Sequence, residues 1–172
     1  MKKLLLMRHA KSSWDDPDLA DLERPLAPRG RKAATRMGKY LKDSGLEPSI
    51  VLCSSAVRAR QTLELLQPSL PESTSIEVEP SLYSAGSEEL LTRIRGVPPS
   101  ERSVLVVGHN PTVQDLALEL AAGDSRYDEL RNKFPTAALA VFDASIEEWK
   151  HLGPDRASLV EFVSPKGLPA KE

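Results

Sequence analysis

The amino-acid sequence predicts a single α/β domain of three layers (α/β/α), in which helices cover both faces of a mostly parallel central sheet. Three observations favour this architecture. The chain has 172 residues, enough for one domain with a substantial core. Short, continuous apolar runs alternate with longer segments of helical periodicity, as is typical of parallel strands that are buried on both faces. The sequence shows no repeat, linker or low-complexity block that would divide it.

Six apolar segments are expected to be strands. Each is too short for a helix, and the run SVLVV is rich in β-branched residues. The last two are expected to close the sheet as antiparallel neighbours. In chain order the segments are Lys3–Met7, Ser49–Cys53, Ser75–Val78, Ser103–Val107, Ala137–Asp143 and Ser158–Val163.

Four segments are expected to be helices, because small or apolar residues recur in them at helical spacing. Gly45 follows the first as a stop signal, and Pro68 ends the second. Asn110 is expected to cap the fourth, with Pro111 at its first helical position. The four segments are Arg29–Ser44, Ala56–Gln67, Glu88–Arg95 and Asn110–Ala122.

The domain is expected to cover residues 1–164, followed by a loop-like tail over residues 165–172 that frays. The segment Asp15–Pro28 is rich in Asp, Pro and Arg and is expected to be a loop. Its acidic part lacks the glycine and the terminal glutamate of a calcium-binding loop. Cys53 is the single cysteine, so the chain can form no internal disulfide and has too few thiolate ligands for a zinc site built on cysteines. We therefore expect no metal and no other cofactor, and we assign Cys53 to packing.

The composition argues against several classes of protein. A formal net charge of −2 gives no basis for electrostatic binding of nucleic acid. No segment approaches the ~20 apolar residues of a membrane span. The apolar run in MKKLLLM is shorter than the roughly 7–15 residues that a signal peptide needs. We expect a soluble, cytoplasmic protein that binds neither nucleic acid nor membrane, and a monomer, because no extra apolar stripe stands out.

Polar residues with related chemistry follow three of the predicted strands. The first strand ends at Arg8-His9, the second at Ser54 with Arg58 one turn into the next helix, and the fourth at Gly108 followed by His109. In an open parallel sheet, ligands bind beyond the carboxyl ends of the strands. If these strands are neighbours, two arginines, two histidines and two helix N-termini meet in one crevice. Those groups suit a phosphoryl group, because helix N-termini and guanidinium groups both bind phosphate oxygens.

A neutral imidazole in such a crevice can act as a nucleophile near pH 7. Nearby arginines should lower the pKa of that histidine and keep the attacking nitrogen unprotonated. Attack on phosphorus would give a phosphohistidine that water then hydrolyses, and the surrounding cations would stabilise the transferring oxygens. His9 or His109 alone could equally be structural. Together with Arg8 and Arg58 they favour a functional site.

Three segments carry a family resemblance. MRHAKSS at Met7–Ser13, SSAVRARQT at Ser54–Thr62 and GHNP at Gly108–Pro111 resemble the histidine phosphatase superfamily, whose hallmark is Arg-His-Gly or Arg-His-Ala after the first strand. The segments Glu23–Ala34 and Phe134–Phe142 are similar to its small branch, the SixA-like phosphohistidine phosphatases. The resemblance covers nearly the whole chain.

The resemblance implies that His9 is the phosphorylated nucleophile and that Arg8, Arg58 and His109 line the phosphate pocket. It also implies a metal-independent phosphatase that acts on phosphohistidine in a phosphotransfer or signalling protein.

The substrate side of the crevice has further candidates. Arg24 either reaches the phosphate from its loop or pairs with Asp21. Ser12 and Lys11 follow the Arg-His motif and are expected to shape the entrance. Asn110 could bind substrate as well as cap a helix.

A general acid is not evident. Larger members of the superfamily use a carboxylate to protonate an oxygen leaving group, yet here Asn110 stands after His109. Glu79, Glu88 and Glu89 lie in a region from which a glutamate could serve. A phosphohistidine substrate relaxes this need, because its imidazole leaving group can carry its own proton. The missing acid therefore favours phosphohistidine.

Two alternative functions remain. A small-molecule phosphomonoesterase would use the same pocket on a different leaving group, whereas a mutase needs a second phosphate pocket and an acid that the sequence does not show. A non-catalytic module that binds phosphate or a phosphoprotein would keep the pocket without turnover. The third histidine, His151, has no comparable neighbours in the sequence and is expected to be a surface or structural residue.

Overall fold

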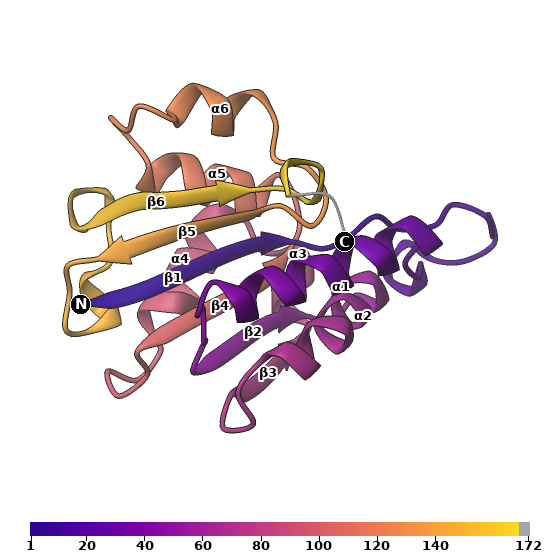
Figure 1. Cartoon of the computed structure of the whole chain (residues 1–172), viewed down its shortest axis with the longest axis horizontal. Helices are drawn as coiled ribbons and strands as arrows, with labels where there is room; N and C mark the ends of the chain where they lie inside the picture. The colour runs from indigo at the N-terminus through magenta and orange to yellow at the C-terminus, as the bar shows by residue number, and fades with distance from the viewer. Residues whose placement is uncertain (169–172) are drawn as a thin grey trace.

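A six-stranded sheet runs through the middle of the molecule, with its strands in the order β3-β2-β4-β1-β5-β6 (Figure 1). The structure is a computed structural model and describes residues 1–168. Strands β1 to β4 are mutually parallel, whereas β5 is antiparallel to both of its neighbours, β1 and β6. The strands are β1 (Lys2–Arg8), β2 (Ile50–Ser54), β3 (Ser75–Glu79), β4 (Ser103–Gly108), β5 (Leu139–Ala144) and β6 (Ala157–Val163). The predicted α/β class and the antiparallel closing pair are thus confirmed.

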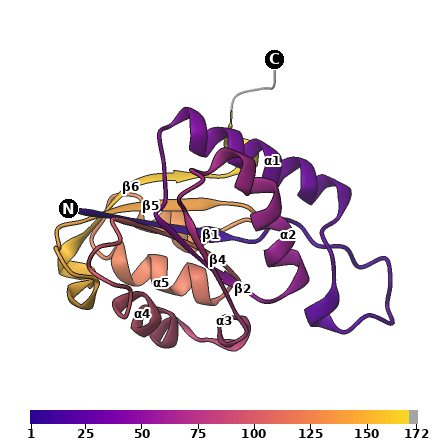
Figure 2. The same cartoon turned by 90° about the horizontal axis from the view of Figure 1, so that it is seen from below.

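Helices cover both faces of this sheet (Figure 2). One face carries α1 (Pro28–Asp43) and α2 (Val57–Leu66). The other carries α3 (Ser81–Ser84), α4 (Ser87–Arg95), α5 (Thr112–Leu120) and α6 (Tyr127–Asn132). Short 3₁₀ turns connect these elements: η1 (Asp21–Glu23), η2 (Gln67–Ser69), η3 (Trp149–His151), η4 (Pro154–Arg156) and η5 (Pro165–Gly167).

The central strand β1 serves both halves of the core. Leu4 and Leu6 pack among the helices α4 and α5, while Leu5 and Met7 pack under α1 and α2, and all four are fully buried. A strand that alternates between two covered faces is apolar at every position, which is why this run shows no polar alternation in the sequence. At the end of the sheet opposite the functional residues, Trp149 is also fully buried, and its indole N–H donates to the carbonyl oxygen of Glu101 at 2.8 Å.

Several sequence-based expectations need correction. The helices α3 and α6 were not predicted, because neither has more than six residues and each buries a single apolar side chain. The helix α5 begins at Thr112 with Pro111 as its N-cap, so Asn110 is not the cap. The amide of Asn110 instead donates to the carbonyl oxygen of Phe134 at 3.0 Å. The tail expected over residues 165–172 begins with the turn η5, and its residues 169–172 lie outside the described part of the chain.

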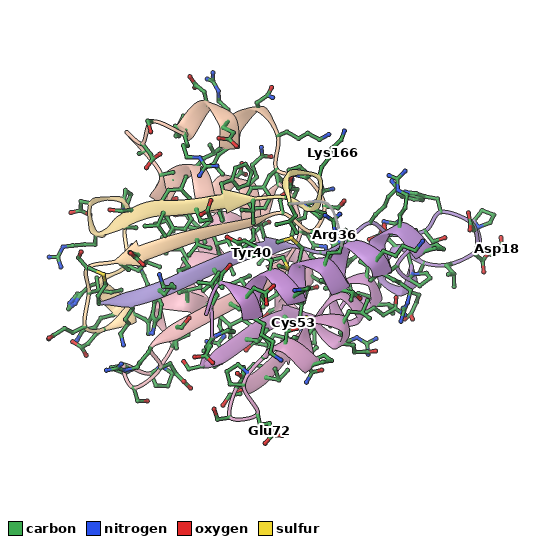
Figure 3. All side chains as sticks on the ribbon, in the orientation of Figure 1. Asp18, Arg36, Tyr40, Cys53, Glu72 and Lys166 are labelled. Carbon is green, nitrogen blue, oxygen red and sulfur yellow. The ribbon has the colours of Figure 1, made fainter. Side chains whose placement is uncertain are left out.

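The loop between β1 and α1 extends away from the sheet and carries Asp18 at its far end (Figure 3). Both ends of the loop are nevertheless fixed. The backbone N–H of Ala27 donates to the carbonyl oxygen of Lys11 at 2.9 Å, and that of Ser13 donates to Pro25 at 2.8 Å. The start of α1 is therefore hydrogen-bonded to the residues that directly follow the Arg-His motif.

Gly30 makes this close approach possible. A Cβ atom at this position would clash with the carbonyl oxygen of Lys11, which is backbone and cannot rotate away. We expect Gly30→Ala to lower the free energy of unfolding by about 1–3 kcal/mol, as overpacking does elsewhere. Urea denaturation measures the effect. Gly96→Ala is the control, because its nearest contact would be 3.4 Å away. A Gly30→Ala variant as stable as the parent would contradict this close contact.

Candidate active site

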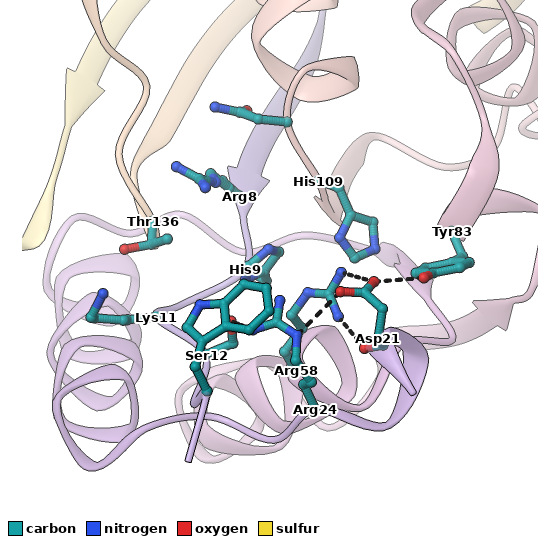
Figure 4. A pocket seen from close by; sticks show the side chains of 12 residues that line it. Arg8, His9, Lys11, Ser12, Asp21, Arg24, Arg58, Tyr83, His109 and Thr136 are labelled. Atoms are coloured by element: carbon teal, nitrogen blue, oxygen red, sulfur yellow. Dashed lines mark hydrogen bonds and ion pairs between the residues drawn. The ribbon is translucent and has the colours of Figure 1, made fainter. Parts of the chain in front are cut away.

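A pocket of about 410 Å³ opens where the parallel strands β1, β2 and β4 end (Figure 4). Side chains from these strand ends meet there with others from the loop before α1. All the site residues predicted from the sequence line it: Arg8, His9, Ser12, Arg24, Arg58, His109 and Asn110. The three strand ends thus converge as expected.

Strand register explains why the two histidines meet. Arg8 of β1 pairs with Gly108 of β4 in parallel register, so the residues that follow them, His9 and His109, lie side by side. The backbone N–H of His9 donates to the carbonyl oxygen of Gly108 at 2.9 Å, which extends the pairing by one residue. The ring centroids of the histidines are 5.1 Å apart.

His9 is held in one tautomer. Its Nδ1 lies 2.7 Å from the carbonyl oxygen of Ala10, which can only accept, so Nδ1 carries the proton and Nε2 keeps a free lone pair. The residue is only 6% exposed. Burial lowers the pKa of His9 to about 3, and the charges of His109, Arg58 and Arg8 act in the same direction, against the hydrogen bond to Ala10. The ring is therefore neutral throughout the physiological range.

His109 is oriented by a buried hydroxyl. Its Nε2 lies 2.7 Å from the Oγ of Ser54, a fully buried residue at the end of β2, and this Oγ also accepts the backbone N–H of Ala56 at 3.2 Å. Burial and the nearby Arg58 lower the pKa of His109 to about 4, with a smaller contribution from Arg8 and an opposing one from Asp21.

Two arginines place cationic groups in the pocket. Arg58, on the first turn of α2, is 6% exposed, and Arg8 is half-buried with one terminal N–H donating to the carbonyl oxygen of Phe134 at 3.1 Å. Burial, followed by the charge of Arg58, lowers the pKa of Arg8. The Nε atoms of both arginines are buried and have no hydrogen-bond partner within the described structure. Buried donors without partners are rare in native structures, and a catalytic role or a bound ion is among the explanations for them.

Asp21 was not expected in the pocket. The strand ends themselves carry no carboxylate, but the turn η1 brings Asp21 in from the loop. Its Oδ2 accepts from Arg58 at 2.9 Å, and its Oδ1 accepts from the Nε of Arg24 at 3.1 Å. Arg24 thus pairs with Asp21, one of the two alternatives considered for it, and it also lines the pocket, so its contact with the phosphate stays a prediction. It donates to the Oγ of Ser12 at 2.9 Å as well.

The three glutamates considered as general acids lie elsewhere. Glu79 forms a bidentate ion pair with Arg93 of α4, with contacts from 2.6 to 3.0 Å. The Oε1 of Glu89 accepts the backbone N–H of Gly86 at the start of α4, and Glu88 is exposed on the same turn. None of these side chains lines the pocket.

Three further lining residues were missed by the sequence analysis: Trp14, Tyr83 and Thr136. Trp14 is 73% exposed and stacks on the guanidinium group of Arg24, 3.5 Å from its ring centroid. The hydroxyl of Tyr83 donates to the Oδ2 of Asp21 at 2.6 Å. Thr136 stands within the FPTAALAVF segment and Trp14 directly after MRHAKSS, so proximity to a motif was their only signal.

Other candidates from the sequence are not in this pocket. Cys53 is fully buried in β2, where burial raises the pKa of its thiol to about 12. His151 is exposed in η3. The described residues contain no group of three His, Cys, Asp or Glu side chains arranged to hold a metal ion. No helix within residues 1–168 is both long and apolar enough to cross a bilayer.

The fold and the pocket together define an α/β protein with its ligand site at the carboxyl edge of a mostly parallel sheet. The family model for the histidine phosphatase superfamily (branch 1) matches residues 4–87. The chain is 34% identical over 140 residues to the phosphohistidine phosphatase SixA of Escherichia coli, which covers 80% of this chain and 83% of that protein. It is 38% identical over 164 residues to an uncharacterized protein of Mycobacterium tuberculosis, covering 93% of this chain and 100% of the other.

Solved structures of SixA proteins have the same fold as this chain. A protein histidine phosphatase SixA complexed with tungstate superposes with a TM-score of 0.78 at 28% identity, covering 95% of this chain and 97% of the other. A presumed phosphohistidine phosphatase SixA from Agrobacterium tumefaciens gives 0.83 at 30% identity, covering 95% and 98%. The chain belongs to the histidine phosphatase superfamily, as a SixA-like member. Its enzyme class is accordingly that of the phosphatases.

The low pKa values of the two histidines predict the pH dependence of activity. Both stay neutral as the pH falls from 7 to 5, so kcat/KM is expected to show no histidine-dependent loss in this range and to fall only near pH 3, when the Nε2 lone pair of His9 takes up a proton. The measurement is kcat/KM for an aryl phosphate, expressed per concentration of its reacting ionic form. A loss centred near the ordinary histidine pKa of ~6.5 would contradict the assignment.

Proposed function

We propose that this protein is a metal-independent phosphatase that works through a phosphorylated His9, with phosphohistidine in a phosphotransfer or signalling protein as its substrate. The observation that carries the proposal is the state of His9. Its Nδ1 proton is bound by the carbonyl of Ala10, which leaves a neutral Nε2 lone pair among arginines whose Nε donors are unpartnered within the described structure.

The reaction then has two steps. The Nε2 of His9 attacks phosphorus, a P–N bond forms, and the leaving group departs with the electron pair of its own bond to phosphorus. Arg8, Arg58 and His109 hold the phosphoryl oxygens as their charge redistributes. Water then attacks the phosphohistidine, which releases inorganic phosphate and regenerates neutral His9. Asn110, Arg24 and Ser12 complete the substrate side of the pocket.

Two observations support phosphohistidine as the substrate. The relatives with a SixA name are phosphohistidine phosphatases by that name. In addition, the carboxyl group of Asp21 has a pKa of about 2, lowered most by the hydrogen bond from Tyr83, so it is ionised and cannot protonate an oxygen leaving group at neutral pH. An imidazole leaving group does not need that proton.

Trapping of the intermediate tests the proposal. The protein is mixed with a phosphorylated histidine-containing phosphotransfer domain in the presence of EDTA, quenched within milliseconds and analysed by mass spectrometry. We expect phosphate on His9 and its loss from the donor. Labelling of His9 by an aryl phosphate alone would favour a small-molecule phosphomonoesterase. Phosphate binding without labelling or turnover from any donor would indicate a non-catalytic binding module.

A further inference from the structure

Asp21 is the one acidic side chain among the described residues that line the pocket. Three donors from different elements fix its carboxylate: Arg24 at 3.1 Å on Oδ1, with Arg58 at 2.9 Å and Tyr83 at 2.6 Å on Oδ2. A carboxylate offers about four lone-pair positions, so one position on Oδ1 stays open. The side chain is 49% exposed, which leaves that position accessible to a ligand.

This carboxylate cannot bind the phosphoryl group, because like charges repel strongly in a partly buried site. It is also a poor general acid, since its low pKa keeps it ionised. The remaining role for the Asp21 carboxylate is that of a fixed hydrogen-bond acceptor at the entrance of the pocket. Such a group suits a part of the substrate that carries an N–H donor or a positive charge.

Resting on the proposed phosphohistidine substrate, we infer that Asp21 determines specificity by accepting a hydrogen bond from the free ring N–H of the phosphohistidine. In that ring one nitrogen is bonded to phosphorus and the other can carry a proton. When His9 attacks, the ring nitrogen bonded to phosphorus takes the electron pair of the breaking bond. The ring leaves as neutral imidazole with the proton it already had on its other nitrogen. Asp21 stabilises that protonated ring, so no protein acid is required.

Trp14 supplies a surface that matches a planar ring. Its indole lines the pocket and is 73% exposed while it stacks on Arg24, and Arg24 is itself anchored to Asp21. Arg24 therefore links the acceptor and the aromatic surface, because it donates to Asp21 and stacks on Trp14. An imidazole ring that donates to Asp21 can pack against Trp14, a contact of the kind that aromatic rings commonly make.

The surrounding charges give the interaction a pH signature. Arg24, Arg58 and Tyr83 contact Asp21, and His109 lies next to Tyr83, with 5.6 Å between the ring centroids. Cationic Arg8 and Lys11, together with neutral His9, complete the titratable groups of the pocket. Without the carboxylate, this cationic surrounding lowers the pKa of the bound substrate ring and disfavours its protonated form. The deficit in kcat, which reports on the bound complex, should therefore grow as the pH rises from 6 to 8.

The test compares two substrates in the parent protein and in Asp21→Asn. One substrate is a histidine peptide phosphorylated on its ring, and the other is p-nitrophenyl phosphate, whose leaving group has no N–H. We expect kcat for the peptide, measured at saturation, to fall by about tenfold or more at pH 8 and by less at pH 6, the effect of one charge-assisted hydrogen bond in the bound complex. With p-nitrophenyl phosphate kcat should fall less and by the same factor at both pH values, because that substrate is affected only through the Asp21–Arg58 ion pair.

Two further variants serve as controls. Asp18→Asn removes the same charge from the far end of the same loop and should leave both activities unchanged (Figure 3). Asp21→Glu keeps the charge and should retain more peptide activity than Asp21→Asn. Equal losses on both substrates, or no loss on either, would overturn the role of Asp21 while leaving the phosphatase proposal intact. A parent protein that cleaves only p-nitrophenyl phosphate would overturn the proposed substrate and, with it, this role.

Discussion

A His9→Ala variant is expected to lose turnover by a factor on the order of 10⁴ to 10⁶, as deletion of a nucleophile does in other enzymes with covalent intermediates. The reason is that the Nε2 lone pair, kept free by the hydrogen bond from Nδ1 to Ala10, is the group that attacks phosphorus. The neutral ring contributes little to binding an anion. Isothermal titration with inorganic phosphate should therefore give an affinity close to that of the parent.

His151→Ala is the matched control, because this histidine is exposed in η3 and lies outside the pocket. Since the replaced ring of His9 is buried, circular dichroism establishes that the variant is folded, and His9→Asn provides a second test with a smaller loss of volume. Turnover at more than a few per cent of the parent rate in both folded variants would exclude His9 as the nucleophile.

An Arg58→Ala variant is expected to lose both turnover and phosphate affinity. Its guanidinium group is buried at the junction of α2 and the pocket, and removing one preorganised donor to a transition state costs roughly 10²- to 10³-fold in kcat. Unlike His9, Arg58 is cationic in the free enzyme, so the ground state loses attraction too. Steady-state kinetics and phosphate titration measure the two losses separately.

Arg60 provides the comparison. It lies two positions further along α2, is exposed, and donates to the carbonyl oxygen of Ser55 rather than into the pocket. Arg60→Ala should therefore behave like the parent protein. Arg58→Lys should recover only part of the activity, because an ammonium group cannot donate in the planar fork of a guanidinium group. Full activity in Arg58→Ala would show that the phosphoryl group does not rest on this side of the pocket.

The sequence predicts the centre of the site well because that centre depends on strand ends. Arg8 ends a buried parallel strand, and His9 and His109 directly follow two such strands, whose ends lie at one edge of the sheet whatever the loops do. The apolar runs identify these strands, so the convergence follows from chain order and parallel pairing alone.

The rest of the pocket depends on tertiary contacts that no local pattern encodes. Asp21 and Trp14 come from a loop without periodicity, and Tyr83 comes from a helix of four residues. Asp21 is fixed by hydrogen bonds from Arg24, Arg58 and Tyr83, whereas Trp14 stacks on Arg24. Glu79 shows that chain position alone can also mislead. It was a candidate general acid by its place in the sequence, but its carboxylate pairs with Arg93 outside the pocket.

The two tryptophans report on different parts of the molecule. Trp14 sits against a guanidinium group at the mouth of the pocket, whereas Trp149 is sealed in the core with its N–H bound to Glu101. An aqueous quencher such as iodide should reach only the first in the native state. Emission from Trp14 can therefore follow ring ligands entering the pocket, while the blue-shifted emission of Trp149 follows the integrity of the fold, and no dye needs to be attached.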